Sequence, residues 1–245
     1  MGQLTGIGFI AKEYIVKLDT LRYRILYPER YDPSIKYPIL FVLHGSGERG
    51  TDNLAQLKHG SELFLRDSIR QKYPAIVIFP QCPLNSSWSN VDIKTNAYGK
   101  RDFFFKEGGK PTKPMALLTK LIKVWLADKS VDKNRVYIGG LSMGAMGTYE
   151  MLRRKPKIFA AAFAICGADN LNNVKKYRKV PLWIFHGEKD VVVLPENSIR
   201  IMERLKELGA NPRFNLYPYA DHKSWDYAFA EHDFLSWLFS HQLTR

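Results

Sequence analysis

One serine lies in a spacing that is typical of a catalytic nucleophile. Ser142 has a glycine two residues away on each side, in the run Gly140-Leu-Ser-Met-Gly144. An apolar strand is expected just before it, at 136–138, and a helix just after it. A strand, a tight turn and a helix together form the setting in which a serine oxygen is held exposed for attack on a carbonyl carbon. The alternative is a glycine-rich turn with a serine that caps a helix.

A serine hydroxyl is a weak nucleophile near neutral pH and needs a neighbouring base. The chain has six histidines, and His222 is the one in a loop after the last expected strand. Hydrolases with this serine turn place their histidine there, after the acid in chain order. We therefore predict that His222 is the base. The alternative for a loop histidine is an ordinary surface residue.

The acid is expected between these two residues, on the loop after the strand before last. Asp190 ends the run His186-Gly-Glu-Lys-Asp190, which follows an apolar stretch. Glu188 competes with it from two residues earlier. Asp221 adjoins the histidine in sequence, but a direct neighbour is badly placed to hold the imidazole ring. We therefore predict Asp190 as the third member of a triad.

A fourth part of such a site is a pair of amides that stabilise a developing oxyanion. The run His44-Gly-Ser-Gly47 follows an apolar stretch at 38–43, so its amides can point toward a reacting carbonyl oxygen. We predict the backbone amides of Ser46 and Met143 for this role. Arg49 and Asp52 follow closely, and we expect them to brace the loop.

The same loop also matches a dinucleotide-binding fingerprint, since Gly45, Gly47 and Gly50 have the required spacing. That alternative needs an acidic residue at the end of a second strand about 20 residues later. Asp67 lies in an expected helix instead. A nucleotide site would also leave the turn around Ser142 unexplained, so we predict no cofactor.

The elements that position these residues alternate between strand and helix from residue 38 onward, which predicts an α/β fold with a mostly parallel central sheet and helices on both faces. Two alternating strands before it predict an N-terminal antiparallel hairpin. We expect one domain over 1–245, with a cleft-bordering insertion at 83–114. Strands are expected at 11–18, 21–27, 38–43, 75–79, 135–138, 159–165, 181–185 and 213–217, and helices at 61–71, 115–129, 143–154, 196–208 and 225–239.

The formal net charge of +13 raises the question of a nucleic-acid partner. The basic residues are scattered through the chain except for one short cluster, which is Lys175, Lys176, Arg178 and Lys179. Such a cluster could contact a phosphate or a polyanion, but a solvated loop between two core strands is the simpler explanation. We therefore expect no nucleic-acid partner.

Cysteine usage and hydropathy say little about the compartment. Cys82 and Cys166 are far apart and each ends an apolar stretch, which predicts two buried free thiols rather than a disulfide. No stretch approaches the roughly 18 apolar residues that span a bilayer. The first ten residues lack a charged leader with an apolar run, although a mature exported form would look the same. The sequence decides neither the location nor the oligomeric state.

Taken together, four runs resemble the α/β-hydrolase superfamily over roughly 38–240: 43–53, 139–146, 186–190 and 221–222. More narrowly, they are similar to prolyl-oligopeptidase-like and polyhydroxybutyrate-depolymerase-like esterases, including feruloyl and acetyl esterases of plant polysaccharides. The resemblance implies a serine ester hydrolase with Ser142, Asp190 and His222 as its triad, and it implies no metal and no diffusible cofactor. The chain has no counterpart of the oligopeptidase propeller, which disfavours peptidase action.

Substrate choice is expected to depend on aromatic residues of the insertion and of the histidine loop. We predict Trp88 and Trp225 as substrate contacts, on a small-molecule or polysaccharide-linked ester. Phe103, Phe104 and Phe105 are further candidates, and the alternative is that these aromatics form the core of the insertion. A peptidase or thioesterase would share the triad. A non-catalytic binding protein with this fold would normally lack one of its members.

Overall fold

The computed structural model describes residues 8–95, 97 and 101–244, except for the side chain of Arg101. Residues 1–7, which belong to the segment considered as a leader, and a small part of the expected insertion at 83–114 lie outside the described residues. Among the described residues, no helix is both long and apolar enough to cross a membrane.

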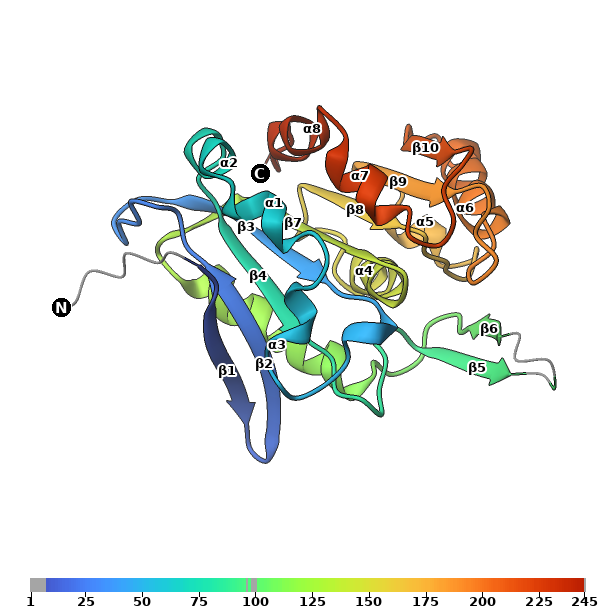
Figure 1. Ribbon diagram of the computed structural model, residues 1–245, viewed down its shortest axis with the longest axis horizontal. Helices are drawn as coiled ribbons and strands as arrows, with labels where there is room; N and C mark the ends of the chain where they lie inside the picture. The colour runs from blue at the N-terminus through green and yellow to red at the C-terminus, as the bar shows by residue number, and fades with distance from the viewer. Residues whose placement is uncertain (1–7, 96, 98–100, 245) are drawn as a thin grey trace.

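An eight-stranded sheet forms the centre of the molecule, in the order β1-β2-β4-β3-β7-β8-β9-β10 (Figure 1). The first two strands pair antiparallel, and β2 pairs antiparallel with β4, whereas every later pairing is parallel. The predicted α/β-hydrolase fold, with its mostly parallel sheet and N-terminal hairpin, is confirmed. The strands are β1 (Ile10–Val16), β2 (Asp19–Leu26), β3 (Tyr37–Leu43), β4 (Ile76–Gln81), β7 (Val131–Leu141), β8 (Ala161–Ile165), β9 (Leu182–Gly187) and β10 (Arg213–Tyr217).

The central strands are apolar along their whole length because both of their faces are covered. In β3, Ile39 and Phe41 belong to one core cluster, which α3, α4, α5 and α6 complete. Leu40 and Val42 alternate with them and belong to a second cluster, under α1, α7 and α8. The helices are α1 (Ser61–Leu65), α2 (Asp67–Lys72), α3 (Lys113–Ala127), α4 (Met143–Arg154), α5 (Val174–Tyr177), α6 (Glu196–Glu207), α7 (Trp225–Ala230) and α8 (Phe234–Ser240), with single 3-10 turns at Ser46–Glu48 and Ala55–Leu57.

Two expected helices are broken in the structure. The helix expected at 61–71 is interrupted at Arg66, whose backbone is extended between α1 and α2. The helix expected at 225–239 is interrupted after α7, where Glu231 takes a ψ of 126°. Both pairs lie against one face of the sheet, and each break lets the two short helices turn separately onto the core.

The expected insertion contains a small hairpin that the sequence pattern did not predict. Strands β5 (Val91–Thr95) and β6 (Arg101–Phe105) pair antiparallel with each other in a separate two-stranded sheet. Figure 1 shows this hairpin projecting from one side of the body. Each strand has only five residues, and Gly and Pro are frequent around them, which hides their alternation in the sequence.

Candidate active site

Ser142 lies at the sharp turn between β7 and α4. Its backbone has φ 51° and ψ −118°, a conformation that residues with a side chain rarely adopt. Close packing holds the turn in place: a Cβ on Gly144 would overlap the carbonyl oxygen of Leu43, and one on Gly140 would lie 2.5 Å from the same oxygen. The two glycines that flank Ser142 are therefore required by the approach of β3, and the strained turn presents the serine at the end of the sheet.

The three predicted triad residues form a continuous hydrogen-bonded chain. His222 Nε2 is 3.0 Å from Ser142 Oγ, and His222 Nδ1 is 2.7 Å from Asp190 Oδ2. Ser142 follows β7, Asp190 follows β9 and His222 follows β10, so the carboxyl ends of parallel strands bring them together. Neither rival acid takes this place. Glu188 and Asp221 are both exposed, and among the described residues neither carboxylate forms a hydrogen bond with the imidazole.

The Asp190 carboxylate is buried and fully bonded. Oδ1 accepts hydrogen bonds from the amides of Val192 and Val193, at 2.8 and 3.0 Å. Burial acts to raise the pKa of Asp190, but hydrogen bonds from His186 and His222 outweigh it and hold this pKa well below its ordinary value. The acid therefore stays ionised and can stabilise an imidazolium at His222.

His186 is a second imidazole on this carboxylate. Its Nε2 lies 2.8 Å from the carbonyl of Val193 and 3.1 Å from Asp190 Oδ2, so it carries a proton and donates to both acceptors. Its Nδ1 is 2.7 Å from Ser198 Oγ. The fully buried ring thus links the acid to its own loop and to α6.

His44 plays a comparable part in the loop after β3. Burial lowers the pKa of His44 to about 4, so the ring is neutral at pH 7. Its Nδ1 donates to the carbonyl of Gly45 at 2.6 Å, and its Nε2 accepts from the amide of Cys82 at 2.9 Å. In a trans peptide the carbonyl and the next amide point in opposite directions. By holding the Gly45 oxygen, His44 aims the Ser46 amide the other way.

Ser46 and Met143 both line a small cavity beside Ser142. Within the described residues, neither amide has a hydrogen-bond partner. Met143 begins α4, whose N-terminal amides and dipole favour a negative charge at this point. Arg49 Nε donates to the carbonyl of Ser46 at 2.9 Å, and Asp52 accepts from two amides of its own turn. Both side chains brace the loop, as the sequence analysis predicted.

The cavity beside Ser142 has a volume of about 70 Å³. Side chains from the β5–β6 hairpin, from α4 and from the loop after Asp190 line it, among them Ile93, Phe103, Met146 and Val193. Part of the expected insertion therefore borders the site.

The two tryptophans predicted as substrate contacts do not line this cavity. Trp88 is fully buried, and its indole donates to the carbonyl of His44 at 3.2 Å. The prediction of a substrate contact at Trp88 is therefore wrong: the side chain supports the loop after β3 from beneath. Trp225 lies against the His222 ring, with 5.6 Å between ring centroids, and is 8% exposed. Its role as a substrate contact stays a prediction, on the histidine side of the triad.

One group of side chains could offer three metal ligands in the described part of the chain. The ligand atoms of Cys166, Asp190 and His222 lie within 4.8 Å of one another. A metal-bound cysteine must be a thiolate, but burial raises the pKa of the Cys166 thiol strongly. The His222 nitrogens already contact Asp190 and Ser142. The chemistry of this set therefore fits a metal poorly, and both cysteines are buried free thiols, as predicted.

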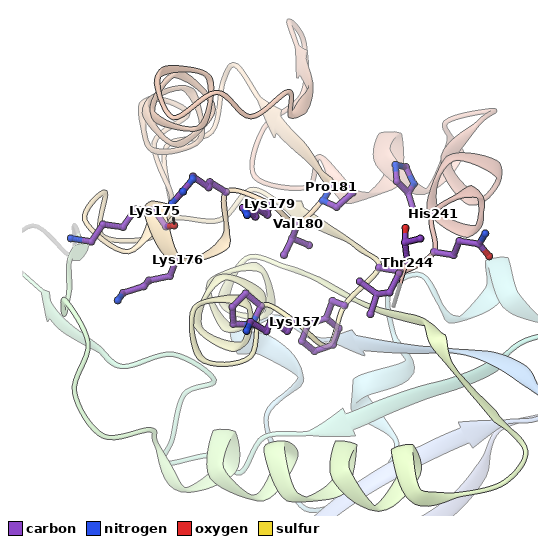
Figure 2. Close-up of a pocket in the computed structure, with 14 residues that line it drawn as sticks. Lys157, Lys175, Lys176, Lys179, Val180, Pro181, His241 and Thr244 are labelled. Carbon is purple, nitrogen blue, oxygen red and sulfur yellow. Dashed lines mark hydrogen bonds between the residues drawn. The ribbon is translucent and has the colours of Figure 1, made fainter.

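A larger cavity, of about 770 Å³, lies away from the triad. It borders the amino ends of β8 and β9, the opposite edge of the sheet from Ser142. The basic cluster Lys175, Lys176, Arg178 and Lys179 belongs to its wall. Figure 2 shows Lys175 and Lys176 at one end of this cavity and His241 and Thr244 at the other. The cluster is therefore no part of the candidate active site.

Sequence reasoning missed the positions of His44 and His186. Both precede a glycine at the end of an apolar strand, and both are buried with their two ring nitrogens in hydrogen bonds. A histidine that ends a fully apolar strand is the signal that could have pointed to them, since such a ring must find partners for its nitrogens inside the protein.

Comparison with known proteins identifies the family of the chain. The model of the phospholipase/carboxylesterase family matches residues 36–236. The chain is similar to a thermostable esterase of known structure, with 33% identity and a TM-score of 0.84 over 96% of this chain. It spans only 63% of that esterase's length.

Two curated relatives are more distant. Lysophospholipase-like protein 1 of Mus musculus is 27% identical over 75% of this chain and 79% of its own length. Acetylxylan esterase A of Aspergillus awamori is 27% identical over 61% of this chain and 47% of its own length.

Proposed function

The chain belongs to the phospholipase/carboxylesterase family of α/β-hydrolases, and from this premise we propose that it hydrolyses carboxylic esters through Ser142, Asp190 and His222. The observation that carries the proposal is the hydrogen-bonded chain from Ser142 Oγ through the imidazole to Asp190. It borders the small cavity that Ser46 and Met143 line, and their amides have no hydrogen-bond partner among the described residues. On this proposal, nucleophile, base, acid and oxyanion donors lie together at one point.

The reaction proceeds in two halves. His222 Nε2 takes the Ser142 proton as Oγ bonds to the ester carbonyl carbon, and the amides of Ser46 and Met143 stabilise the oxyanion. The imidazolium then protonates the alcohol oxygen, the carbon–oxygen bond to the alcohol breaks, and an acyl-serine remains. A water that gives its proton to His222 attacks the acyl carbon. Collapse of the second oxyanion releases the acid and returns the proton to Ser142.

We place the substrate among acyl esters of polysaccharides, and more narrowly among feruloyl or acetyl esters. The sequence resemblance to esterases of that group supports this choice, and so does the likeness to an acetylxylan esterase. A thioesterase or peptidase with the same triad is the second candidate. The shared chemistry of acyl transfer favours it, because the acyl-enzyme is the same whichever group leaves. The thioesterase is also supported by the likeness to acyl-protein thioesterase 1 of Emericella nidulans, which is 28% identical over 60% of this chain and 70% of its own length.

The test is hydrolysis of p-nitrophenyl acetate by the purified protein beside Ser142→Ala, followed by matched oxygen ester, thioester and amide substrates. Loss of the nucleophile should lower kcat by about 10⁴-fold or more. Preference for the oxygen ester supports the esterase assignment, and preference for the thioester would move it to the second candidate. Equal background rates in both proteins would contradict ester hydrolysis and favour a non-catalytic protein with this fold.

A further inference from the structure

The small cavity beside Ser142 identifies the side of the site that receives the acyl group. The alcohol must depart next to His222, because that imidazole protonates it. The cavity is bordered by Ser142 and by the two oxyanion amides, but neither His222 nor Trp225 lines it. An ester whose carbonyl oxygen meets the Ser46 and Met143 amides would therefore direct its alcohol toward the histidine and its acyl part into this cavity.

The β5–β6 hairpin closes this cavity with one aromatic side chain. Phe103 pairs with Ile93 across the hairpin, and both side chains line the cavity. Phe103 stacks on Phe105, with ring centroids 6.1 Å apart, and packs against the cluster that contains Met146 and Val193. The ring is thus held between the hairpin, α4 and the loop that carries the acid.

Successive side chains of a strand point to opposite faces, so Phe104 points away from the cavity that Phe103 lines. Phe104 is 51% exposed and does not line the cavity, whereas Phe103 and Phe105 are half-buried. The two neighbouring phenylalanines therefore have the same chemistry and opposite surroundings. A substitution at one has a matched control at the other.

The size of the cavity limits what it can take. An apolar cavity of about 150 Å³ can bind a single benzene ring, whereas this one has about 70 Å³. Apolar side chains such as Ile93, Phe103 and Met146 make up the larger part of its lining, and Ser46, Arg49, Ser87 and Ser142 complete it. The space accepts a methyl or ethyl group but not a feruloyl ring or a long acyl chain.

We propose that Phe103, backed by Met146, is the specificity-determining wall of the acyl site and restricts the enzyme to acetyl-sized acyl groups. This inference rests on the proposed ester hydrolysis at Ser142. It selects acetyl over feruloyl esters within that proposal, and it assigns the selection to a hairpin that lies outside the main sheet.

The experiment compares kcat/KM for p-nitrophenyl acetate, butyrate and octanoate, which share one leaving group, and for a feruloyl ester. Wild type should favour acetate over octanoate by at least about 100-fold, because a pocket that excludes even one methylene already discriminates about 10- to 200-fold. Phe103→Ala should raise the octanoate-to-acetate ratio at least about tenfold. Phe104→Ala should leave that ratio within about twofold of wild type, as expected for a surface substitution.

A second readout needs no turnover. Methanesulfonyl fluoride and phenylmethanesulfonyl fluoride place a methyl or a benzyl group on the acyl side. In both cases Ser142 Oγ bonds to sulfur, the sulfur–fluorine bond breaks, fluoride leaves, and His222 takes the serine proton. Wild type should react faster with the methyl reagent, and Phe103→Ala should gain reactivity toward the benzyl reagent alone.

The two proposals fail in different ways. The assignment of Phe103 is overturned if wild type hydrolyses the feruloyl ester or octanoate as efficiently as acetate. It is also overturned if Phe103→Ala keeps the wild-type octanoate-to-acetate ratio while it still hydrolyses acetate. In both cases the proposed ester hydrolysis stands. If no ester is hydrolysed and neither sulfonyl fluoride labels Ser142, the proposed function itself is overturned.

Discussion

Replacing His44 by glutamine should slow catalysis, and replacing it by asparagine should mainly weaken the fold. Asparagine places an amide nitrogen near the position of the imidazole Nδ1, so it can still donate to the carbonyl of Gly45. Glutamine places an oxygen near the position of Nε2, so it can still accept from the amide of Cys82. The two variants therefore separate the two hydrogen bonds that the ring makes.

The expected magnitudes follow from what each variant releases. In His44→Gln the Gly45–Ser46 peptide is no longer held, and fixing one residue's backbone is worth about 1–2 kcal/mol. That corresponds to a fall in kcat of about 5- to 30-fold. Complete removal of an oxyanion donor would cost more, about 100- to 1,000-fold. In His44→Asn the Cys82 amide stays buried without an acceptor, which costs about 1–3 kcal/mol of unfolding free energy.

The assay is kcat and KM for p-nitrophenyl acetate together with urea unfolding of the same three proteins. The glutamine variant should lose kcat with little change in KM, since the amide acts on the transition state. A glutamine variant with wild-type kcat would refute the argument that His44 aims the Ser46 amide. So would an asparagine variant that loses more kcat than the glutamine one.

Three further predictions concern the acid, the turn and pH. Asp190→Asn should lower kcat by about 10⁴-fold with little change in KM, because His222 then adopts the wrong tautomer; initial rates measure this, and a fall below tenfold would contradict the role of the acid. Gly144→Ala should destabilise the protein by more than about 3 kcal/mol, whereas Gly47→Ala, with open space around its Cβ position, should stay within about 0.5 kcal/mol of wild type in thermal unfolding. The pKa of His44 is lower in the fold, at about 4, than its ordinary 6.5, so its neutral ring contributes stability that is fully present above pH 6.5 and is lost as the pH falls toward 4. Wild type should therefore lose up to about 3 kcal/mol more than His44→Asn over this range in urea titrations.

Chain order and strand ends predicted most of the site. The turn at Ser142, the loop of Asp190 and the loop of His222 follow strands whose apolar runs are plain in the sequence, so their meeting at one sheet edge follows from parallel pairing. The roles of His44 and His186 depend on which carbonyl or carboxylate lies beside each ring after folding. No local pattern encodes that.

Side-chain direction in the insertion was the harder problem. Trp88, a large aromatic near the expected cleft, packs inward beneath the loop after β3, against the place that Gly147 leaves open. Phe103 and Phe104 are adjacent and chemically identical, and only the pairing of β5 with β6 decides which of them faces the cavity. A one-residue shift in that register would exchange them.

The place of β3 in the sheet has a consequence for how the chain folds during synthesis. β3 lies between β4 and β7, and Ile39 pairs with Val136, 97 residues later in the chain (136 − 39). A ribosome that has completed β3 and β4 has still not made the strand that covers the other edge of β3. That edge, flanked by apolar residues on both faces, stays open until β7 emerges, so the nascent chain passes through a slow and aggregation-exposed stage. Because α4 and Ser142 follow β7 directly, the same pairing that ends this exposure also brings the serine turn against the loop of Ser46.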